Sequence, residues 1–370
     1  MQNFGPNELL EDVLNRSFCI GCGACIDLCP YFKSYKGKTS MLFPCTLQEG
    51  RCFAYCPKVE VDLDHVSKEM FDGLYKTEPL GYHREVKISK AGTQMNGGNF
   101  QAGGTVSALM NFALNKGYIN AAVLTDRDGL LPVPRLATDN EEILRCSSSK
   151  YVASPTLSAL NQAIKEGYSR IGVVATPCQT LAIAQMRFNP MDEKDFIDPI
   201  GFVIGLFCTW ALDFMTFKTF VSKHTDIDKI KKMDIPPPPA EIMEIFTEDE
   251  KFEISLNEIR EFIPNTCSYC MDMTSEFSDI SVGVLEGRPD MNTIIIRTQR
   301  GQQILDGAQK EGYVIVDDIP NESLAHLKEA AHNKKKRALI KAKQDGLLNT
   351  EENKRSYIRV KPKTVEEIIV

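Results

Sequence analysis

Near its N-terminus the chain reads Cys19-Ile-Gly-Cys22-Gly-Ala-Cys25-Ile-Asp-Leu-Cys29-Pro30, and three more cysteines follow at Cys45, Cys52 and Cys56. The spacing Cys-x2-Cys-x2-Cys-x3-Cys-Pro is typical of iron–sulfur ligation, in which three cysteines hold one cubane and the fourth reaches a neighbouring cluster. Gly21 and Gly23 suit this wrapping, because glycine tolerates the positive-φ turns that a tight loop around a cluster requires. A disulfide knot or a structural zinc site is the alternative, but zinc sites seldom have the Cys-x3-Cys-Pro ending.

The seven cysteines predict a small iron–sulfur domain over residues 1–60 that resembles bacterial-type ferredoxins. Its second half is asymmetric, because Glu49 and Gly50 stand where an eighth cysteine would be expected. The crossed ligand pattern assigns one cluster to Cys19, Cys22, Cys25 and Cys56, and the other to Cys29, Cys45 and Cys52. The second cluster is either [3Fe-4S], as in seven-iron ferredoxins, or [4Fe-4S] with a non-cysteine ligand. A single cluster, with the spare cysteines structural, is the remaining alternative.

The cysteine content also bounds the cellular setting. Twelve cysteines in 370 residues are placed too irregularly for a secreted disulfide scaffold, which indicates metal ligation in a reducing compartment. Residues 1–14 do not have the charged-then-apolar pattern of a signal peptide. The longest uncharged apolar run, residues 199–212, is shorter than the ~20 residues that a bilayer requires. We therefore expect a cytoplasmic protein without a membrane span.

Charge is distributed unevenly along the chain. The net charge is −7, yet residues 326–370 hold 12 Lys and Arg against 6 Asp and Glu, a balance of +6 that leaves −13 for residues 1–325. A basic C-terminal tail either suits an acidic ligand or partner or is simply a solvated helix face. Nucleic acid is not expected as a partner, since the basic residues are not interleaved with aromatic residues.

From residue 101 onward the pattern predicts a mixed α/β body. We expect residues 61–100 to be a linker, 101–325 the body, and 326–370 a basic helical tail. Pro236–Pro239 reads as a polyproline spacer, followed by a hairpin over 241–256. The expected helices are 105–115, 157–166, 178–187, 208–224, 302–310 and 322–344, and the expected strands are 59–63, 121–125, 170–175, 200–207, 280–285, 293–297 and 313–316.

Four cysteines of the body lie far apart in sequence but in informative places. Cys178 and Cys208 each follow an apolar strand, where α/β proteins gather ligand-binding loops, and Cys267 and Cys270 form a Cys-x2-Cys pair. Gathered at the top of one sheet, the four would make a complete cluster site. The alternatives are buried structural cysteines or a redox-active Cys178 at a helix N-terminus. Cys146 has no partner in sequence and is read as a core residue.

Five motifs follow one another along the body: Gln101-Ala-Gly-Gly104, Ser149-Lys150-Tyr151, Ala175-Thr-Pro-Cys178-Gln179, Ile204-Gly-Leu-Phe-Cys208, and Cys267-Ser-Tyr-Cys-Met-Asp-Met-Thr-Ser-Glu-Phe-Ser-Asp279-Ile-Ser-Val-Gly283. In this order they resemble the β-subunit family of coenzyme F420 hydrogenase/dehydrogenase, over about residues 90–345. An N-terminal ferredoxin domain fused to such a body resembles the input subunits of F420H2 dehydrogenases.

The resemblance implies that the body binds FAD and one [4Fe-4S] cluster. It places the cluster ligands at Cys178, Cys208, Cys267 and Cys270. It places flavin contacts at Gly103, Gly104, Thr105, Ser149, Lys150, Tyr151, Pro177 and Gln179. A helix N-terminus with free N–H groups favours a pyrophosphate, and Lys150 adds a positive charge. An ordinary Gly-x-Gly-x-x-Gly fingerprint after a strand is absent.

We therefore expect a subunit that converts hydride transfer at FAD into one-electron transfer through three clusters, with no side chain required as acid or base. The expected carrier is coenzyme F420, and the expected partners are subunits of hydrogenase, formate dehydrogenase or heterodisulfide reductase type. Two departures from the family pattern leave open a carrier other than F420. The family often has an acidic residue at the position of Ala102, and it has a glycine- and lysine-rich segment in place of Pro236–Pro239. The rivals are a reductase of a different organic substrate and a non-catalytic electron-bridging subunit.

Overall fold

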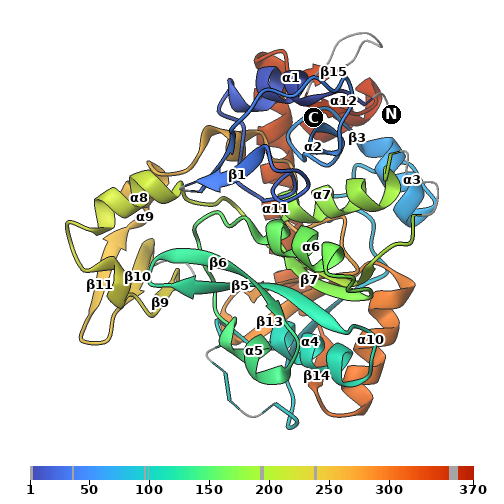
Figure 1. The fold of residues 1–370 in the computed structure, drawn as a ribbon. Coiled ribbons are helices and arrows are strands. Elements are labelled where there is room, and N and C mark those ends of the chain that lie inside the picture. The colour runs from blue at the N-terminus through green and yellow to red at the C-terminus, as the bar shows by residue number, and fades with distance from the viewer. Residues whose placement is uncertain are drawn as a thin grey trace.

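The computed structural model describes residues 3–35, 37–95, 97–98, 100–191, 196–236, 240–349 and 357–370. An eight-stranded sheet in the order β14-β4-β13-β12-β8-β7-β5-β6 forms the centre of the body (Figure 1). Its four central strands, β12, β8, β7 and β5, run parallel, and the outer pairings are antiparallel. The strands are β4 (Glu85–Ala91), β5 (Ala121–Asp128), β6 (Leu131–Ala137), β7 (Ile171–Ala175), β8 (Ile200–Leu206), β12 (Ile280–Leu285), β13 (Arg288–Ile296) and β14 (Val314–Asp318).

Helices cover both faces of this sheet, so the central strands are buried apolar runs, as parallel strands usually are. On one face α4 (Thr105–Asn115), α5 (Asn140–Arg145) and α10 (Gln299–Lys310) share a core with β12 and β13. On the other face, α6 (Thr156–Lys165) and α7 (Pro177–Phe188) share a core with β7. The prediction of a mixed α/β body is confirmed, and the predicted helix 105–115 has the observed bounds of α4.

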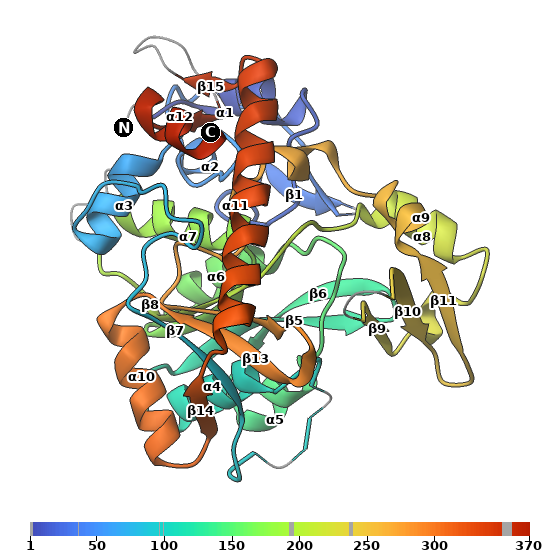
Figure 2. The ribbon, with the colours of Figure 1, turned by 180° about the vertical axis from the view of Figure 1, so that it is seen from behind.

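A small lobe projects from the side of the body (Figure 2). It consists of the sheet β11-β10-β9 with α8 (Phe214–Val221) and α9 (Leu256–Arg260). The strands are β9 (Lys232–Asp234), β10 (Ile242–Phe246) and β11 (Lys251–Ser255), so the predicted hairpin is confirmed. Of the predicted proline spacer, Pro237–Pro239 lie outside the described residues.

The N-terminal cysteine segment packs firmly on the body. It contains α1 (Pro6–Leu9), a π-helical turn (Leu10–Leu14), β1 (Phe32–Tyr35), β2 (Lys38–Met41) and α2 (Arg51–Ala54). Asn161 of α6 donates to the carbonyls of Ala24 and Ile26 at 3.0 and 2.6 Å. Gln185 of α7 donates to the Cys56 carbonyl at 3.0 Å. These bonds hold two cysteine loops against the helices that follow the sheet.

Residues 61–100 differ from the expected linker. They contain β3 (Val61–Asp62), α3 (Leu63–Phe71) and β4, which pairs with β13 and β14 inside the main sheet. The sequence of β4, Glu-Val-Lys-Ile-Ser-Lys-Ala, alternates only weakly between apolar and polar residues, because both faces of the strand are only partly buried. Asn96 and Asn99 of the glycine-rich end lie outside the described residues.

Residues 326–370 also differ from a solvated tail. α11 (Asn321–Gln344) runs from the main sheet to the N-terminal segment (Figure 2), and Lys334 and Lys335 on it are 5% and 0% exposed. Beyond it, β15 (Leu348–Asn349) and β16 (Ile358–Arg359) form a sheet with β3, and α12 (Pro362–Ile369) packs on α11. No helix among the described residues is long and apolar enough to cross a membrane.

Candidate functional site

A cavity of 720 Å³ lies beyond the carboxyl ends of β7 and β8, where the loops of the body meet the N-terminal segment and the small lobe. It is lined by Cys178, Cys208, Cys267 and Cys270, here called the four body cysteines, and by seven of the eight positions expected to contact flavin. These seven are Gly104, Thr105, Ser149, Lys150, Tyr151, Pro177 and Gln179. The cavity thus brings together the two sets of residues that the resemblance assigned to separate cofactors.

The N-terminus of α4 forms one wall of this cavity. Gly104 caps the helix with a φ of 78°, a left-handed conformation that glycine adopts without strain. The Thr105 N–H donates to Asn292 Oδ1 at 3.2 Å, and the Thr105 hydroxyl lies 2.8 Å from the Ser89 hydroxyl. Gly103, the eighth expected position, does not line the cavity; a Cβ there would lie 2.9 Å from Asn292 Oδ1. Asn292, which lines the cavity, had no sequence signal.

A loop of residues 146–151 forms another wall of the cavity. Lys150 Nζ donates to the carbonyls of Cys146, Ser147 and Ser148 at 2.5, 2.9 and 2.9 Å, so it organises this loop. Burial, together with nearby Arg127, lowers the pKa of Lys150 to about 8. The expected cation is therefore present at the cavity wall, but carbonyl groups already accept its hydrogen bonds.

Arg127 lies behind this loop and provides a second cation. Its Nη2 donates to the Ser149 carbonyl at 2.6 Å, whereas its Nε and Nη1 are buried without a hydrogen-bond partner among the described residues. Burial lowers the pKa of Arg127. Buried guanidinium donors without partners are costly, and an anionic group in the adjoining cavity would offset part of this cost through its charge. No local pattern in the sequence singles out Arg127.

Tyr151 and Gln101 connect the cavity to the small lobe. The Tyr151 hydroxyl accepts from the Ile235 N–H at 3.1 Å, and burial raises the pKa of Tyr151. The Gln101 side chain accepts from the Ser149 N–H at 3.2 Å and also contacts Asp234 of β9. The lobe therefore closes one end of the cavity.

The start of α7 carries Pro177, Cys178 and Gln179 into the cavity. Gln179 Oε1 accepts from the Thr176 N–H at 2.9 Å, completing a capping box, and its Nε2 donates to the Ser154 carbonyl at 2.9 Å. The capping box fixes the first turn of α7, and thereby the position of the Cys178 thiol.

The four body cysteines converge because β7 and β8 are parallel neighbours, so Cys178 and Cys208 emerge at the same edge of the sheet. Cys267 lies in a 3-10 turn (Asn265–Tyr269), and Cys270 follows it. Burial raises the pKa of Cys208 to about 12, with contributions from its neighbours Cys178, Cys267 and Cys270. No three His, Cys, Asp or Glu side chains in the described ranges come close enough to share one metal ion. This finding does not bear on a four-iron cluster, whose cysteine ligands lie farther apart because each of them binds a different iron.

Two buried lysines accompany this group. Lys334 Nζ donates to the carbonyls of Cys208 and Asp272 at 2.6 and 2.8 Å. Lys58, which is 4% exposed, donates through Nζ to the Tyr357 hydroxyl at 3.0 Å and interacts electrostatically with Cys178, Cys267 and Cys270. Burial opposes their charge, but these interactions raise the pKa of both lysines. Buried cations suit thiolate ligands, because a buried negative charge requires a compensating positive one.

The N-terminal cysteines form two further groups. Cys22, Cys25 and Cys56 interact with one another or with Cys19, and Cys52 interacts with Cys29 and Cys45. Burial raises the pKa of Cys52 to about 11. Cys22 also interacts with Cys178, and Cys25 with Cys52, so the three groups follow one another in a row. This grouping is the one that the crossed pattern predicts, and the ligand assignment itself stays a prediction.

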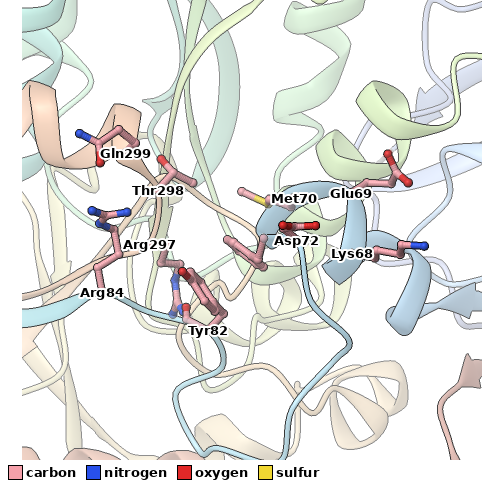
Figure 3. A pocket seen from close by; sticks show the side chains of 10 residues that line it. Lys68, Glu69, Met70, Asp72, Tyr82, Arg84, Arg297, Thr298 and Gln299 are labelled. Atoms are coloured by element: carbon pink, nitrogen blue, oxygen red, sulfur yellow. The ribbon is translucent and has the colours of Figure 1, made fainter.

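A second cavity of 460 Å³ lies between α3 and the start of α10 (Figure 3). Arg84 and Arg297 line one side, and residues at the end of α3 line the other. The Arg297 guanidinium is fully buried and donates to Ser281, to Thr274 and to the carbonyls of Leu80 and Tyr82. Its hydrogen bonds therefore serve the fold of this region.

Comparison with known families gives three matches. Residues 168–322 match the family of the C-terminal part of the coenzyme F420 hydrogenase/dehydrogenase beta subunit, and residues 94–161 match the family of its N-terminal part. Residues 12–31 match a 4Fe-4S binding domain. The three matches cover the α/β body and the first four cysteines of the chain.

Individual proteins agree with these matches. The chain is 29% identical to the coenzyme F420-dependent sulfite reductase of Methanocaldococcus jannaschii over 86% of its own length, but it spans only 50% of that protein. Its fold is similar to that of a chain in the F420-reducing [NiFe] hydrogenase complex from Methanosarcina barkeri, with a TM-score of 0.65, 23% identity, and coverage of 77% of this chain and 98% of that one. It is 30% identical to a subunit of the F(420)H(2) dehydrogenase of Methanosarcina mazei, over 84% of this chain and 88% of that protein. With both halves of the family matched as well, the chain belongs to the coenzyme F420 hydrogenase/dehydrogenase beta subunit family.

Proposed function

We propose that the chain is the flavin and iron–sulfur subunit of a redox complex, with coenzyme F420 as its two-electron carrier. The observation that carries this proposal is the single cavity shared by the expected flavin positions and the four body cysteines. When bound, FAD supplies the exchange between hydride transfer and single-electron transfer. The relatives named for coenzyme F420 support the choice of carrier.

The residues of the chain have distinct tasks in this proposal. The α4 N-terminus orients an anionic cofactor in the cavity, and the charge of Arg127 behind the 146–151 loop favours its binding. Lys58 and Lys334 compensate negative charge at the four-cysteine group. The row of three cysteine groups then leads from the cavity, through the group of Cys22 and Cys56, to the group of Cys45 and Cys52.

The test is anaerobic purification followed by titration of the bound flavin with reduced coenzyme F420, with NADH and NADPH in parallel. We expect stoichiometric flavin bleaching by reduced F420 alone. Absence of flavin in the purified protein would contradict the F420-dependent function and also the alternative of a reductase for a different organic substrate. It would favour a non-catalytic electron-bridging subunit. Bleaching by NADH alone would assign a different carrier, which the departure at Ala102, a cavity-lining residue, leaves open.

A further inference from the structure

A tyrosine near the C-terminus contacts the cysteine segments of both regions. The strand β16 pairs in parallel with β3, and Figure 2 shows β15 and α12 beside the N-terminal segment. Tyr357 precedes β16, and its ring lies 6.2 Å from that of Phe18, the residue before the first cysteine. The same ring lies 6.4 Å from that of Tyr269, which stands within the Cys267–Cys270 pair. The chain therefore returns at Tyr357 to the place where the two cysteine regions meet.

The Tyr357 hydroxyl is buried and has one hydrogen left to donate. The residue is 8% exposed, and its hydroxyl oxygen accepts a hydrogen bond from Lys58 Nζ at 3.0 Å. A tyrosine hydroxyl can also donate, but none of the residues that the structure describes provides an acceptor for its hydrogen. A buried O–H group without an acceptor costs free energy. An acceptor supplied by a bound cofactor would remove this cost.

The groups around the hydroxyl favour a sulfur as that acceptor. Tyr357 interacts electrostatically with Cys178 and Cys270, and Lys58 interacts with the same two thiols and with Cys267. The Lys58 ammonium also lies 5.2 Å from the centre of the Tyr357 ring, so the two side chains hold each other in place. A hydroxyl that accepts from an ammonium is polarised and becomes a stronger donor. It is therefore suited to an anionic sulfur.

We propose that the Tyr357 hydroxyl donates a hydrogen bond to a sulfur of the cluster held by the four body cysteines, and thereby raises the reduction potential of that cluster. The inference rests on the proposed function, because it assumes a cluster at these cysteines. Hydrogen bonds to the sulfurs are among the factors that set the potential of an iron–sulfur cluster. Reduction makes the sulfurs more negative, so a donor stabilises the reduced state more than the oxidised state. Tyr357 is a residue that tunes the potential, and it exchanges no electron itself.

The test is Tyr357→Phe in the anaerobically purified holoprotein, which removes the hydroxyl and keeps the ring. We expect about a tenfold change in the one-electron equilibrium of the body cluster, a fall of ~59 mV in its midpoint potential. EPR-monitored redox titration measures this fall. In ENDOR spectra of the reduced protein, the wild type should show a proton coupling that disappears in D2O and that the variant lacks.

The matched control is Tyr269→Phe. Tyr269 belongs to the same group of rings, but its hydroxyl donates to Asp345 Oδ2 at 2.7 Å and so has no hydrogen for a sulfur. This variant should keep the wild-type potential of the body cluster and the exchangeable proton coupling. A second variant carries 3-fluorotyrosine in place of Tyr357, which keeps the packing and makes the hydroxyl a stronger donor. It should raise the potential above that of the wild type.

The outcomes separate a hydrogen bond from a packing effect. An unchanged or raised potential in Tyr357→Phe would overturn the inference, as would an equal fall in the Tyr269→Phe control. Retention of the exchangeable proton coupling in Tyr357→Phe would also overturn it, because another group would then be the donor. If Tyr357→Phe does not fold, the fluorinated variant decides, and no rise in its potential would contradict the inference. Absence of a body cluster from the wild type would contradict the proposed function and the inference together.

Discussion

The N-terminal cysteines and the body cysteines are assembled in opposite ways. Seven cysteines between residues 19 and 56 reach their groups through short loops and the turns at Gly21 and Gly23, whose φ angles are 69° and 87°. The body group gathers Cys178, Cys208 and the Cys267–Cys270 pair only after two parallel strands have placed their ends side by side. The cysteines of the first region are therefore brought together locally, whereas those of the second are brought together by tertiary structure and lie beside lysines from both ends of the chain.

The largest expected effect comes from breaking the body group. Cys208→Ser should remove about four irons per chain and stop electron flow from the flavin to the N-terminal groups, because the three remaining cysteines leave one iron of the cluster without its thiolate. Iron analysis and flavin-to-acceptor kinetics measure both effects. The control is Cys146→Ser, a buried cysteine that lines the cavity but belongs to none of the three cysteine groups, and this variant should keep its full iron content. Loss of iron in the control, or its retention in Cys208→Ser, would contradict the assignment.

Breaking the N-terminal group of Cys29, Cys45 and Cys52 should affect fewer clusters than breaking the body group. Cys45→Ser should abolish only the second N-terminal cluster, since Cys45 interacts with Cys52 of the same group. If that cluster is [3Fe-4S], the oxidised protein should show its EPR signal and the variant should lose it. Flavin reduction should continue at the wild-type rate. A simultaneous loss of the body cluster signal would show that the two regions are not independent.

The same contrast explains what could be predicted from the sequence. Local spacing identified the seven N-terminal cysteines, and apolar runs located β7, β8 and the ends on which Cys178 and Cys208 stand. We did not predict Lys58, Lys334 and Arg127 as residues of the site. The local sequence around a charged residue in an amphipathic or polar segment does not show whether that residue is buried. The segment of Lys334 was expected to be a basic tail, yet its ammonium is enclosed by carbonyls of two cysteine loops. Burial of such groups is decided by packing between distant segments.

Replacing Lys335, the residue after Lys334 on α11, with an uncharged residue should lower the stability of the fold. Lys335 Nζ lies 2.9 Å from Glu276 Oε1, with side chains 0% and 3% exposed, so Lys335→Met leaves a buried carboxylate without its partner. We expect a loss of about 3–5 kcal/mol in the free energy of unfolding. The double variant Lys335→Met with Glu276→Leu should recover most of it, since both members of the buried ion pair are removed together. Thermal unfolding of the two variants measures the difference, and equal destabilisation would show that packing rather than charge is responsible.

Lys334 gives the smallest effect, and the one that most directly distinguishes the two cysteine regions. Its charge lies against the Cys208 loop, where it favours the more negative, reduced state of a cluster. Lys334→Gln should therefore lower the midpoint potential of the body cluster, by on the order of 60 mV for a tenfold change in a one-electron equilibrium. The potentials of the N-terminal clusters should move much less. The matched control is Lys341→Gln on the same helix, where the side chain is 39% exposed and pairs with Asp345. EPR-monitored redox titration resolves the signals, and an equal shift of every cluster would mean that Lys334 acts through the packing of α11 rather than through its charge.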